Sequence, residues 1–332
     1  MKGIRSFATR CAQKLRTWFP KKTDDAFDIV RKVLFFVSGV TLVVSLSVLI
    51  YESVMIPSAY TSEMEAVREI YRPADYAPDA ETEKTEEPLR LKDLREINGD
   101  TVGWLSFTSP DENVGLHIDY PVLQGENNEY YLTHTFYQKK NKTGSLFLDY
   151  RNELEPQRDK SLIIYGHNLS TGLMFSGLNK LVNNLYAART ATSFTLTTET
   201  GTDTYLVFGV MISNADPAEG PVFNYLRRTF ASDEDFTDYV AELRRRSMYD
   251  YSVDVTKTDE LLLLSTCVPR REAQYKGSRT VVMARKARPN EVVITPSLTT
   301  NHDCLFPLTY YVTKNLPVPN EYTKMSTKTK GE

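Results

Sequence analysis

Cysteine and histidine are both scarce in this chain. Its 332 residues include three cysteines, Cys11, Cys267 and Cys304, and four histidines. Three dispersed cysteines are too few for a disulfide framework. The sequence also lacks HExxH, paired CxxC motifs, GxGxxG after a strand and a P-loop, which are the usual signatures of metal and nucleotide sites. We therefore expect the protein to work without a bound cofactor or metal.

The chain also has no large excess of positive or negative charge. Lysine and arginine total 40 residues and aspartate and glutamate total 43, which gives a formal net charge of −3. A protein that binds nucleic acid through its surface usually carries a broad basic patch. The composition therefore argues against a nucleic-acid partner.

One long uncharged stretch does occur, at residues 33–50 (VLFFVSGVTLVVSLSVLI). About 20 apolar residues in a helix cross the hydrocarbon core of a bilayer, so residues 33–51 are predicted to form a transmembrane anchor. A cleaved signal peptide is the alternative, although its apolar region is usually shorter. Residues 1–32 are rich in lysine and arginine, which favours a cytoplasmic N-terminus and places the rest of the chain outside the cell.

Residues 52–88 are predicted to form an extracytoplasmic linker. The stretch RPADYAPDAETEKTEEP, which ends at residue 88, is acidic, contains proline and has few large apolar side chains, as solvated spacers do. Met64, Val67 and Ile70 recur at helical spacing, so a short helix is expected around residues 62–71.

Residues 89–290 have the composition and periodicity of a folded domain. It opens with a predicted helix that places Leu91, Leu94 and Ile97 on one face and stops at Asn98-Gly99. Short apolar runs separated by turn residues follow, at residues 102–107, 117–125, 144–150, 161–168, 193–198, 204–213, 260–267 and 279–286. Eight strand-like runs with few helices predict a closed eight-stranded β-barrel, because closure leaves no strand edge unpaired.

One long helix is predicted late in this domain, within residues 223–250. Ser232 is its expected N-cap, with Asp235 three residues further on as in a capping box. The apolar residues that form its buried stripe are Phe236, Tyr239, Val240 and Leu243. The tail at residues 291–332 is rich in proline and is expected to be loosely ordered or disordered, with residues 307–313 docking as an extra strand.

The run LLLLSTC at residues 261–267 has apolar residues on both faces and polar residues only at its end. This pattern is typical of a central strand that carries Cys267 to the mouth of the barrel. If residues 279–286 return antiparallel, Arg279 lies beside Cys267 and Arg285 lies about 20 Å away. Loop residues Arg270 and Arg271 remain possible partners.

His167 also follows an apolar run, at residues 161–165, and can reach the same mouth. A thiolate, an imidazole and a guanidinium together can perform acyl transfer, as nucleophile, proton donor and oxyanion stabiliser. From the residues alone, a buried cysteine that fills the core and a structural histidine are the more common cases.

Several separated motifs resemble the sortases, and more narrowly class B, over about residues 89–287. They are INGDTVGWLSF, IDYPVLQGENNEYYL, GSLFLDYRN, YGHN followed by TGLMF, and LLSTC with an arginine opening the next strand. The inserted helix fits the same class. The resemblance implies that the catalytic residues are His167, Cys267 and Arg279. It also implies that the substrate-binding residues are Asn128, Leu132, Tyr225, Leu226 and Ser265.

Sortases are membrane-anchored cysteine transpeptidases of Gram-positive bacteria, and the resemblance implies that activity here. Cys267 would cleave the C-terminal sorting pentapeptide of a secreted protein and form a thioester. An amine of the peptidoglycan precursor would then accept the protein at the outer membrane face. Two alternatives stay open: a pilin-polymerising sortase with a lysine acceptor, and a catalytically silent, membrane-anchored binding protein.

Overall fold

The fold is described from a computed structural model, which covers residues 19–21, 23–72, 89–109, 111, 113–269, 271–293 and 295–322. The chain divides into two compact units, Met1–Thr61 and Ser62–Glu332.

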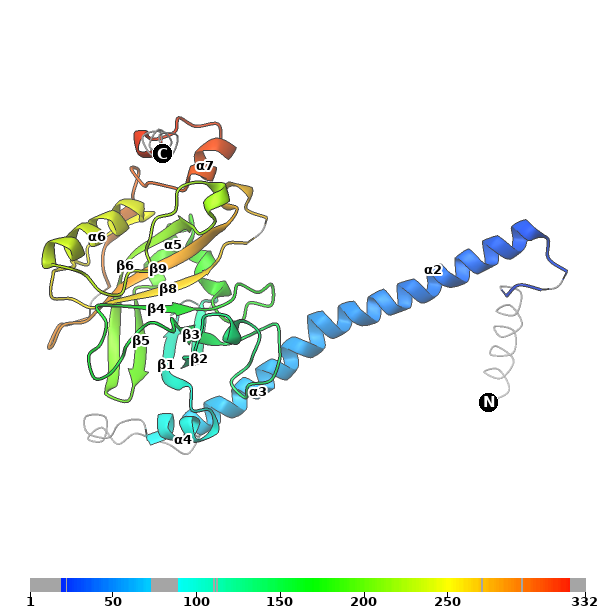
Figure 1. Cartoon of the computed structure of the whole chain (residues 1–332), viewed down its shortest axis with the longest axis horizontal. Helices are drawn as coiled ribbons and strands as arrows, with labels where there is room; N and C mark the ends of the chain where they lie inside the picture. The colour runs from blue at the N-terminus through cyan, green and yellow to red at the C-terminus, as the bar shows by residue number, and fades with distance from the viewer. Residues whose placement is uncertain are drawn as a thin grey trace. The chain divides into compact units, whose positions relative to one another are not determined.

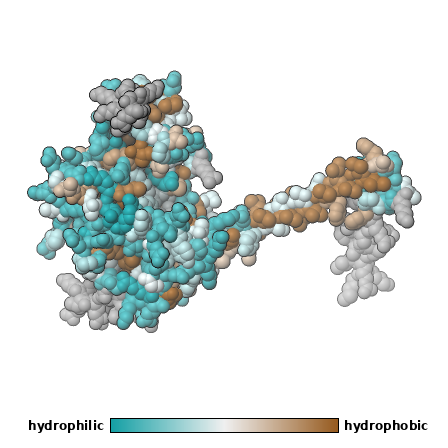
Figure 2. All heavy atoms as spheres, viewed as in Figure 1, coloured by the Kyte–Doolittle hydropathy of each residue, from teal (hydrophilic) through white to brown (hydrophobic). Residues whose placement is uncertain are grey.

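The first unit is dominated by α2 (Ala26–Ile50), which is followed by a π-helical turn, η1 (Tyr51–Met55). Asp25 caps α2, since its side chain accepts a hydrogen bond from the Asp28 amide. None of the residues of α2 is buried, and apolar side chains run along the helix (Figure 2). The helix is long and apolar enough to cross a membrane, and it contains all but the last residue of the predicted anchor.

The second unit contains a barrel with short helices around it (Figure 1). Its helices are the end of α3 (Ile56–Tyr71), α4 (Leu89–Ile97), α5 (Leu185–Thr190), α6 (Asp233–Arg246) and α7 (Leu308–Thr313). Its short 3-10 helices are η3 (Tyr130–Leu132), η4 (Ser176–Leu181), η5 (Pro217–Glu219) and η6 (Ala273–Tyr275). Its strands are β1 (Thr101–Thr108), β2 (His117–Leu123), β3 (Leu146–Leu148), β4 (Ser161–Tyr165), β5 (Ser193–Thr198), β6 (Gly201–Asn214), β7 (Tyr249–Tyr251), β8 (Leu261–Cys267), β9 (Ser278–Lys286) and β10 (Leu298–Thr300).

Eight strands close into a barrel in the order β1-β2-β3-β4-β8-β9-β6-β5, and β5 pairs with β1 to complete it. Each of the eight apolar runs predicted from the sequence supplies one barrel strand, so the predicted fold is confirmed. Most pairs are antiparallel, but β2 pairs with β3 and β4 pairs with β8 in parallel. Strand β8 lies between β4 and β9, and its four leucines are fully buried.

Two helices pack beside β1 and β2. The last turns of α3 stack Tyr71 on Trp104 of β1, with ring centroids 4.1 Å apart. The Arg68 guanidinium donates to the Asp119 carbonyl of β2 at 3.1 Å. In α4, Leu91 and Leu94 are buried as expected, but Ile97 is 45% exposed. Ile97 is the last residue of that helix, so the predicted apolar face does not extend to it.

The inserted helix is confirmed, but it is shorter than the predicted range. Helix α6 covers only Asp233–Arg246, because the Ser232 side chain caps it by accepting from the Asp235 amide at 3.1 Å. The Asp235 carboxylate reaches back to the amide of Ala231 rather than that of Ser232, so the capping box is shifted by one residue. The predicted apolar stripe of the helix is buried and packs against the barrel; its residues are Phe236, Tyr239, Val240 and Leu243.

The C-terminal segment corrects a prediction. Residues 295–322 are ordered: β10 pairs with β7, and residues 308–313, expected as a strand, form helix α7. Pro307 stands directly before this helix, where an N–H would have no partner within the helix, so proline is accommodated there. Residues 323–332 lie outside the described part of the chain.

Loss of the α6 cap should weaken the fold. We expect Ser232→Ala to lower the free energy of unfolding by about 1 kcal/mol, because the Asp235 amide loses its acceptor. Urea titration of the full chain in detergent, followed by near-ultraviolet circular dichroism, measures the change. Ser297→Ala, at an exposed position outside any helix, is the matched control and should change stability by less than about 0.5 kcal/mol. Equal effects of both variants would contradict the capping role.

Candidate active site

Cys267 is the last residue of β8, and its neighbour on β9 is Arg279. The antiparallel register pairs Cys267 with Arg279 and Leu261 with Arg285. The predicted register is therefore confirmed, and Arg285 lies at the opposite end of the strand pair. There its guanidinium is buried and bound to Glu291 at 2.6 Å.

The other arginines near Cys267 in the sequence are less well placed. The side chain of Arg271 is 86% exposed and points to the Glu272 carboxylate, 3.9 Å away. Arg270 lies outside the described residues. The strand register thus favours Arg279 as the cation beside the thiol.

His167 reaches the same rim through the parallel pairing of β4 with β8. The register pairs Tyr165 with Ser265, and two hydrogen bonds extend the pairing beyond the end of β4. The Gly166 amide donates to the Ser265 carbonyl at 3.2 Å, and the Thr266 hydroxyl donates to the Gly166 carbonyl at 2.7 Å. His167 follows directly, so it leaves its strand alongside the end of β8.

Close packing fixes the backbone before His167. A Cβ on Gly166 would lie 2.4 Å from Cδ2 of Leu146 and 2.8 Å from the Phe175 ring, so only glycine fits. Nε2 of His167 lies 2.7 Å from the carbonyl oxygen of Leu132. Because a carbonyl only accepts, Nε2 carries the proton in this bond, and the bond fixes the orientation of the ring.

The two described cysteines have opposite environments. Both are free thiols, but Cys267 is exposed and Cys304 is buried. The Cys304 thiol donates to the Arg246 carbonyl at 3.3 Å, and burial raises its pKa to about 12. Cys304 is therefore chemically quiet, whereas the thiol of Cys267 is accessible to a substrate.

The predicted substrate residues Tyr225 and Ser265 form a buried pair behind the thiol. Their hydroxyl oxygens lie 2.9 Å apart, and Tyr239 holds the Tyr225 carbonyl through a 2.7 Å hydrogen bond. Burial raises the pKa of Tyr225, while the hydrogen bond to Ser265 and the charge of Arg279 oppose the rise. The Arg279 guanidinium, next to Cys267, is thus near enough to Tyr225 to lower its pKa. Leu226 is half-buried against the apolar cluster that α6 covers.

The predicted residues Asn128 and Leu132 lie on the other side, in the loop between β2 and β3. Asn128 donates to the Asp149 carboxylate at 3.1 Å and accepts from the Tyr150 amide at 3.0 Å. Burial opposes ionisation of Asp149, but hydrogen bonds from Arg151 and Tyr165 outweigh it and hold its pKa below the ordinary value. Leu132 contacts the site through the carbonyl that orients His167.

Asn179 was not found from the sequence. Its amide nitrogen donates to the Cys267 carbonyl at 3.1 Å, and its amide oxygen accepts from the Thr280 hydroxyl at 2.6 Å. One side chain therefore ties the end of β8 to β9. Asn179 belongs to η4, far from Cys267 in the sequence, and no motif marks it.

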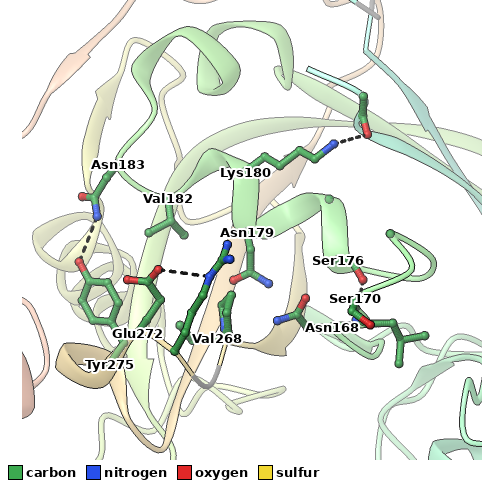
Figure 3. Close-up of a pocket in the computed structure, with 16 residues that line it drawn as sticks. Asn168, Ser170, Ser176, Asn179, Lys180, Val182, Asn183, Val268, Glu272 and Tyr275 are labelled. Atoms are coloured by element: carbon green, nitrogen blue, oxygen red, sulfur yellow. Dashed lines mark hydrogen bonds and ion pairs between the residues drawn. The ribbon is translucent and has the colours of Figure 1, made fainter. Parts of the chain in front are cut away.

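A cavity of about 890 Å³ opens beside these residues (Figure 3). Its lining includes Asn168, directly after His167, and Val268, directly after Cys267. Asn179 and Lys180 of η4 and Glu272 of the β8–β9 loop line it as well. The rim therefore combines an exposed thiol, an oriented imidazole and a guanidinium with room for a substrate next to them. Such a set can form and resolve a thioester.

The chain is similar to known proteins. The family model of the sortase domain matches residues 114–287. Sortase B of Listeria monocytogenes is 35% identical over 216 residues, which cover 64% of this chain and 80% of the relative. The chain belongs to the sortase family. Sortase B of Staphylococcus aureus is 30% identical over 198 residues, covering 59% of this chain and 74% of the relative.

Solved sortase B structures share the fold. That of Clostridium perfringens superposes with a TM-score of 0.52 at 29% identity, covering 59% of this chain and 99% of the other. A sortase B–substrate complex from Staphylococcus aureus gives 0.56 at 25% identity, with coverages of 70% and 96%. The relatives named above are sortase B proteins, and the two solved structures share the fold of this chain.

The contrast between the two thiols can be measured directly. We expect iodoacetamide at pH 8 to alkylate Cys267 at least about tenfold faster than Cys304, because burial keeps Cys304 protonated and inaccessible. Peptide mapping by mass spectrometry at several time points resolves the two sites. Alkylation of Cys304 as fast as that of Cys267 would contradict the burial described here.

Proposed function

We propose that this protein is a cysteine transpeptidase in which Cys267 is the nucleophile, His167 the proton donor and Arg279 the oxyanion partner. The observation that carries the proposal is the strand register. Strand β8 ends at Cys267, β9 begins next to it with Arg279, and β4 runs parallel to it towards His167. Membership of the sortase family supports the same roles.

The proposed reaction has two steps. The Cys267 thiolate attacks the carbonyl carbon of the scissile peptide bond, and the Arg279 guanidinium stabilises the oxyanion. The bond to the leaving amine breaks as His167 gives that amine a proton, which leaves a thioester on Cys267. An incoming amine then attacks the thioester and loses a proton to His167, and the thiolate leaves. One amide is exchanged for another, so no energy-supplying cofactor is needed.

The proposed donor is the C-terminal sorting pentapeptide of a secreted protein. Leu132 and Leu226 are half-buried and can offer apolar contact, and Asn128 can offer an amide. The Tyr225–Ser265 pair supports the strand end from behind. The proposed acceptor is an amine of the peptidoglycan precursor, and a lysine of a pilin-like protein is the alternative.

The proposed topology brings the enzyme to both substrates. Residues 1–32 would lie in the cytoplasm, residues 33–51 would cross the membrane and residues 52–88 would link the anchor to a catalytic domain at residues 89–290. The basic first segment and the apolar helix α2 support this orientation. The catalytic domain would then face the cell wall.

Removing the nucleophile should abolish the reaction but not the fold. With Cys267→Ala, we expect no acyl-enzyme when the chain is incubated with a library of candidate sorting pentapeptides and examined by intact mass. Cys304→Ala is the matched control and should acylate like the unchanged chain, because Cys304 is buried away from the rim. Turnover by the Cys267→Ala variant would refute the nucleophile assignment. A silent binding protein would form no acyl-enzyme in any variant.

The arginine assignment has its own test. Arg279→Ala should slow acyl-enzyme formation by about 10²- to 10³-fold, because the developing oxyanion loses its cation. Arg271→Ala should leave the rate within about twofold, since its side chain is largely exposed and makes only a surface ion pair with Glu272. Rapid quench-flow sampling with detection by mass spectrometry gives both rates. A larger loss in the Arg271 variant than in the Arg279 variant would reverse the assignment.

A further inference from the structure

The segment after the barrel lies beyond residues 114–287, which match the sortase domain. We call residues 298–322 the C-terminal brace. Its first part is attached to α6 and β7: the Asn301 amide donates to the Met248 carbonyl at 2.9 Å and the Leu305 amide donates to the Arg245 carbonyl at 3.0 Å. Strand β10 adds a pairing with β7. The brace is thus anchored at the end of the inserted helix.

The brace then reaches the loop between Cys267 and Arg279. Tyr310 of α7 stacks on Tyr275 of η6, with ring centroids 5.8 Å apart and planes inclined by 10°. Phe306 stacks on Tyr310 with ring centroids 4.1 Å apart, and it also stacks on Tyr275 at 6.3 Å. The Thr309 hydroxyl donates to the Gln274 carbonyl at 3.0 Å. An aromatic stack and a hydrogen bond therefore hold η6 from outside.

The β8–β9 loop, which the brace contacts at η6, forms one wall of the cavity beside the catalytic rim. Glu272 and Tyr275 come from this loop, and Asn183 on the facing wall donates to the Tyr275 hydroxyl at 3.2 Å (Figure 3). The residues that the resemblance assigns to the sorting peptide, which all lie in the described part of the chain, do not line this cavity: Asn128, Leu132, Tyr225, Leu226 and Ser265. The cavity is therefore a second compartment at the rim.

We propose that the C-terminal brace positions the β8–β9 loop, and with it the cavity wall, for the amine acceptor; Tyr310 is its main positioning residue. This inference rests on the proposed transpeptidase function. The case for an acceptor rests on position, because the cavity includes Asn168 and Val268, the neighbours of His167 and Cys267. The charged side chains of its lining already have partners: Glu272 pairs with Arg271, and Lys180 donates to the carbonyls of Val114 and Gly115. The brace thus acts on the acceptor through Tyr275 without touching the thiol.

The test separates acylation from transfer in the full chain. Tyr310→Ala should raise the KM for a triglycine acceptor by about tenfold, because the wall loses an aromatic stack that fixes it. The rate of acyl-enzyme formation from the sorting peptide should stay within about twofold. Hydroxylamine, an amine too small to need the cavity wall, should resolve the acyl-enzyme of both proteins at the same rate.

Two matched variants distinguish positioning from a general effect on the fold. Tyr310→Phe keeps the ring and should restore the KM for triglycine. Val312→Ala alters an exposed position of the same helix, 65% accessible, and should leave the KM unchanged. A lysine peptide as a second acceptor should respond in the same way as triglycine if the wall serves amine acceptors in general.

The outcomes are distinct for the two proposals. An unchanged KM for triglycine in Tyr310→Ala, or an equal loss of acylation and transfer, would overturn the positioning role. An equal rise in KM in Val312→Ala would overturn it as well. If the unchanged chain forms no acyl-enzyme with any sorting peptide, the transpeptidase proposal itself fails, whatever the brace does.

Discussion

The pairing of β8 with two different neighbours is the constraint on which the site depends. Its parallel partner β4 runs to the same rim and ends just before His167, while its antiparallel partner β9 starts there with Arg279. Because β8 has one parallel and one antiparallel neighbour, three groups meet at the same rim: the end of β4, the start of β9 and the last residue of β8. Four buried leucines hold β8 in place in the barrel wall. The positions of the three polar groups at the rim therefore follow from apolar packing. The chemistry at the rim therefore relies on burial several residues away.

Much of this could be predicted from the sequence, because the decisive signals are local. Apolar runs bounded by turns predicted the eight barrel strands, and two runs adjacent in the sequence predicted the register that pairs Cys267 with Arg279. Features that depend on distant contacts could not be predicted. Asn179 reaches Cys267 only because η4 folds over the end of β8. The tail orders because α6 and η6 offer it partners, which a proline-rich composition does not reveal.

The two sides of the rim differ in burial and in the contacts that hold them in place. Tyr225 and Ser265 are buried and hydrogen-bonded to each other, and Leu132 is tied to His167 through its carbonyl. This side is preorganised by the barrel and by α6. The other side is a polar cavity whose wall is a loop, supported by a segment outside the sortase domain match.

The most direct measurement is a crystal structure of the chain after reaction with a sorting peptide whose scissile carbonyl is replaced by a thiol-reactive group. We predict a covalent bond to Sγ of Cys267, with the peptide oxygen facing the Arg279 guanidinium and the His167 ring on the leaving-group side. Attachment at another residue, or a Cys267 adduct that neither His167 nor Arg279 can reach, would contradict the convergence of these groups at one rim.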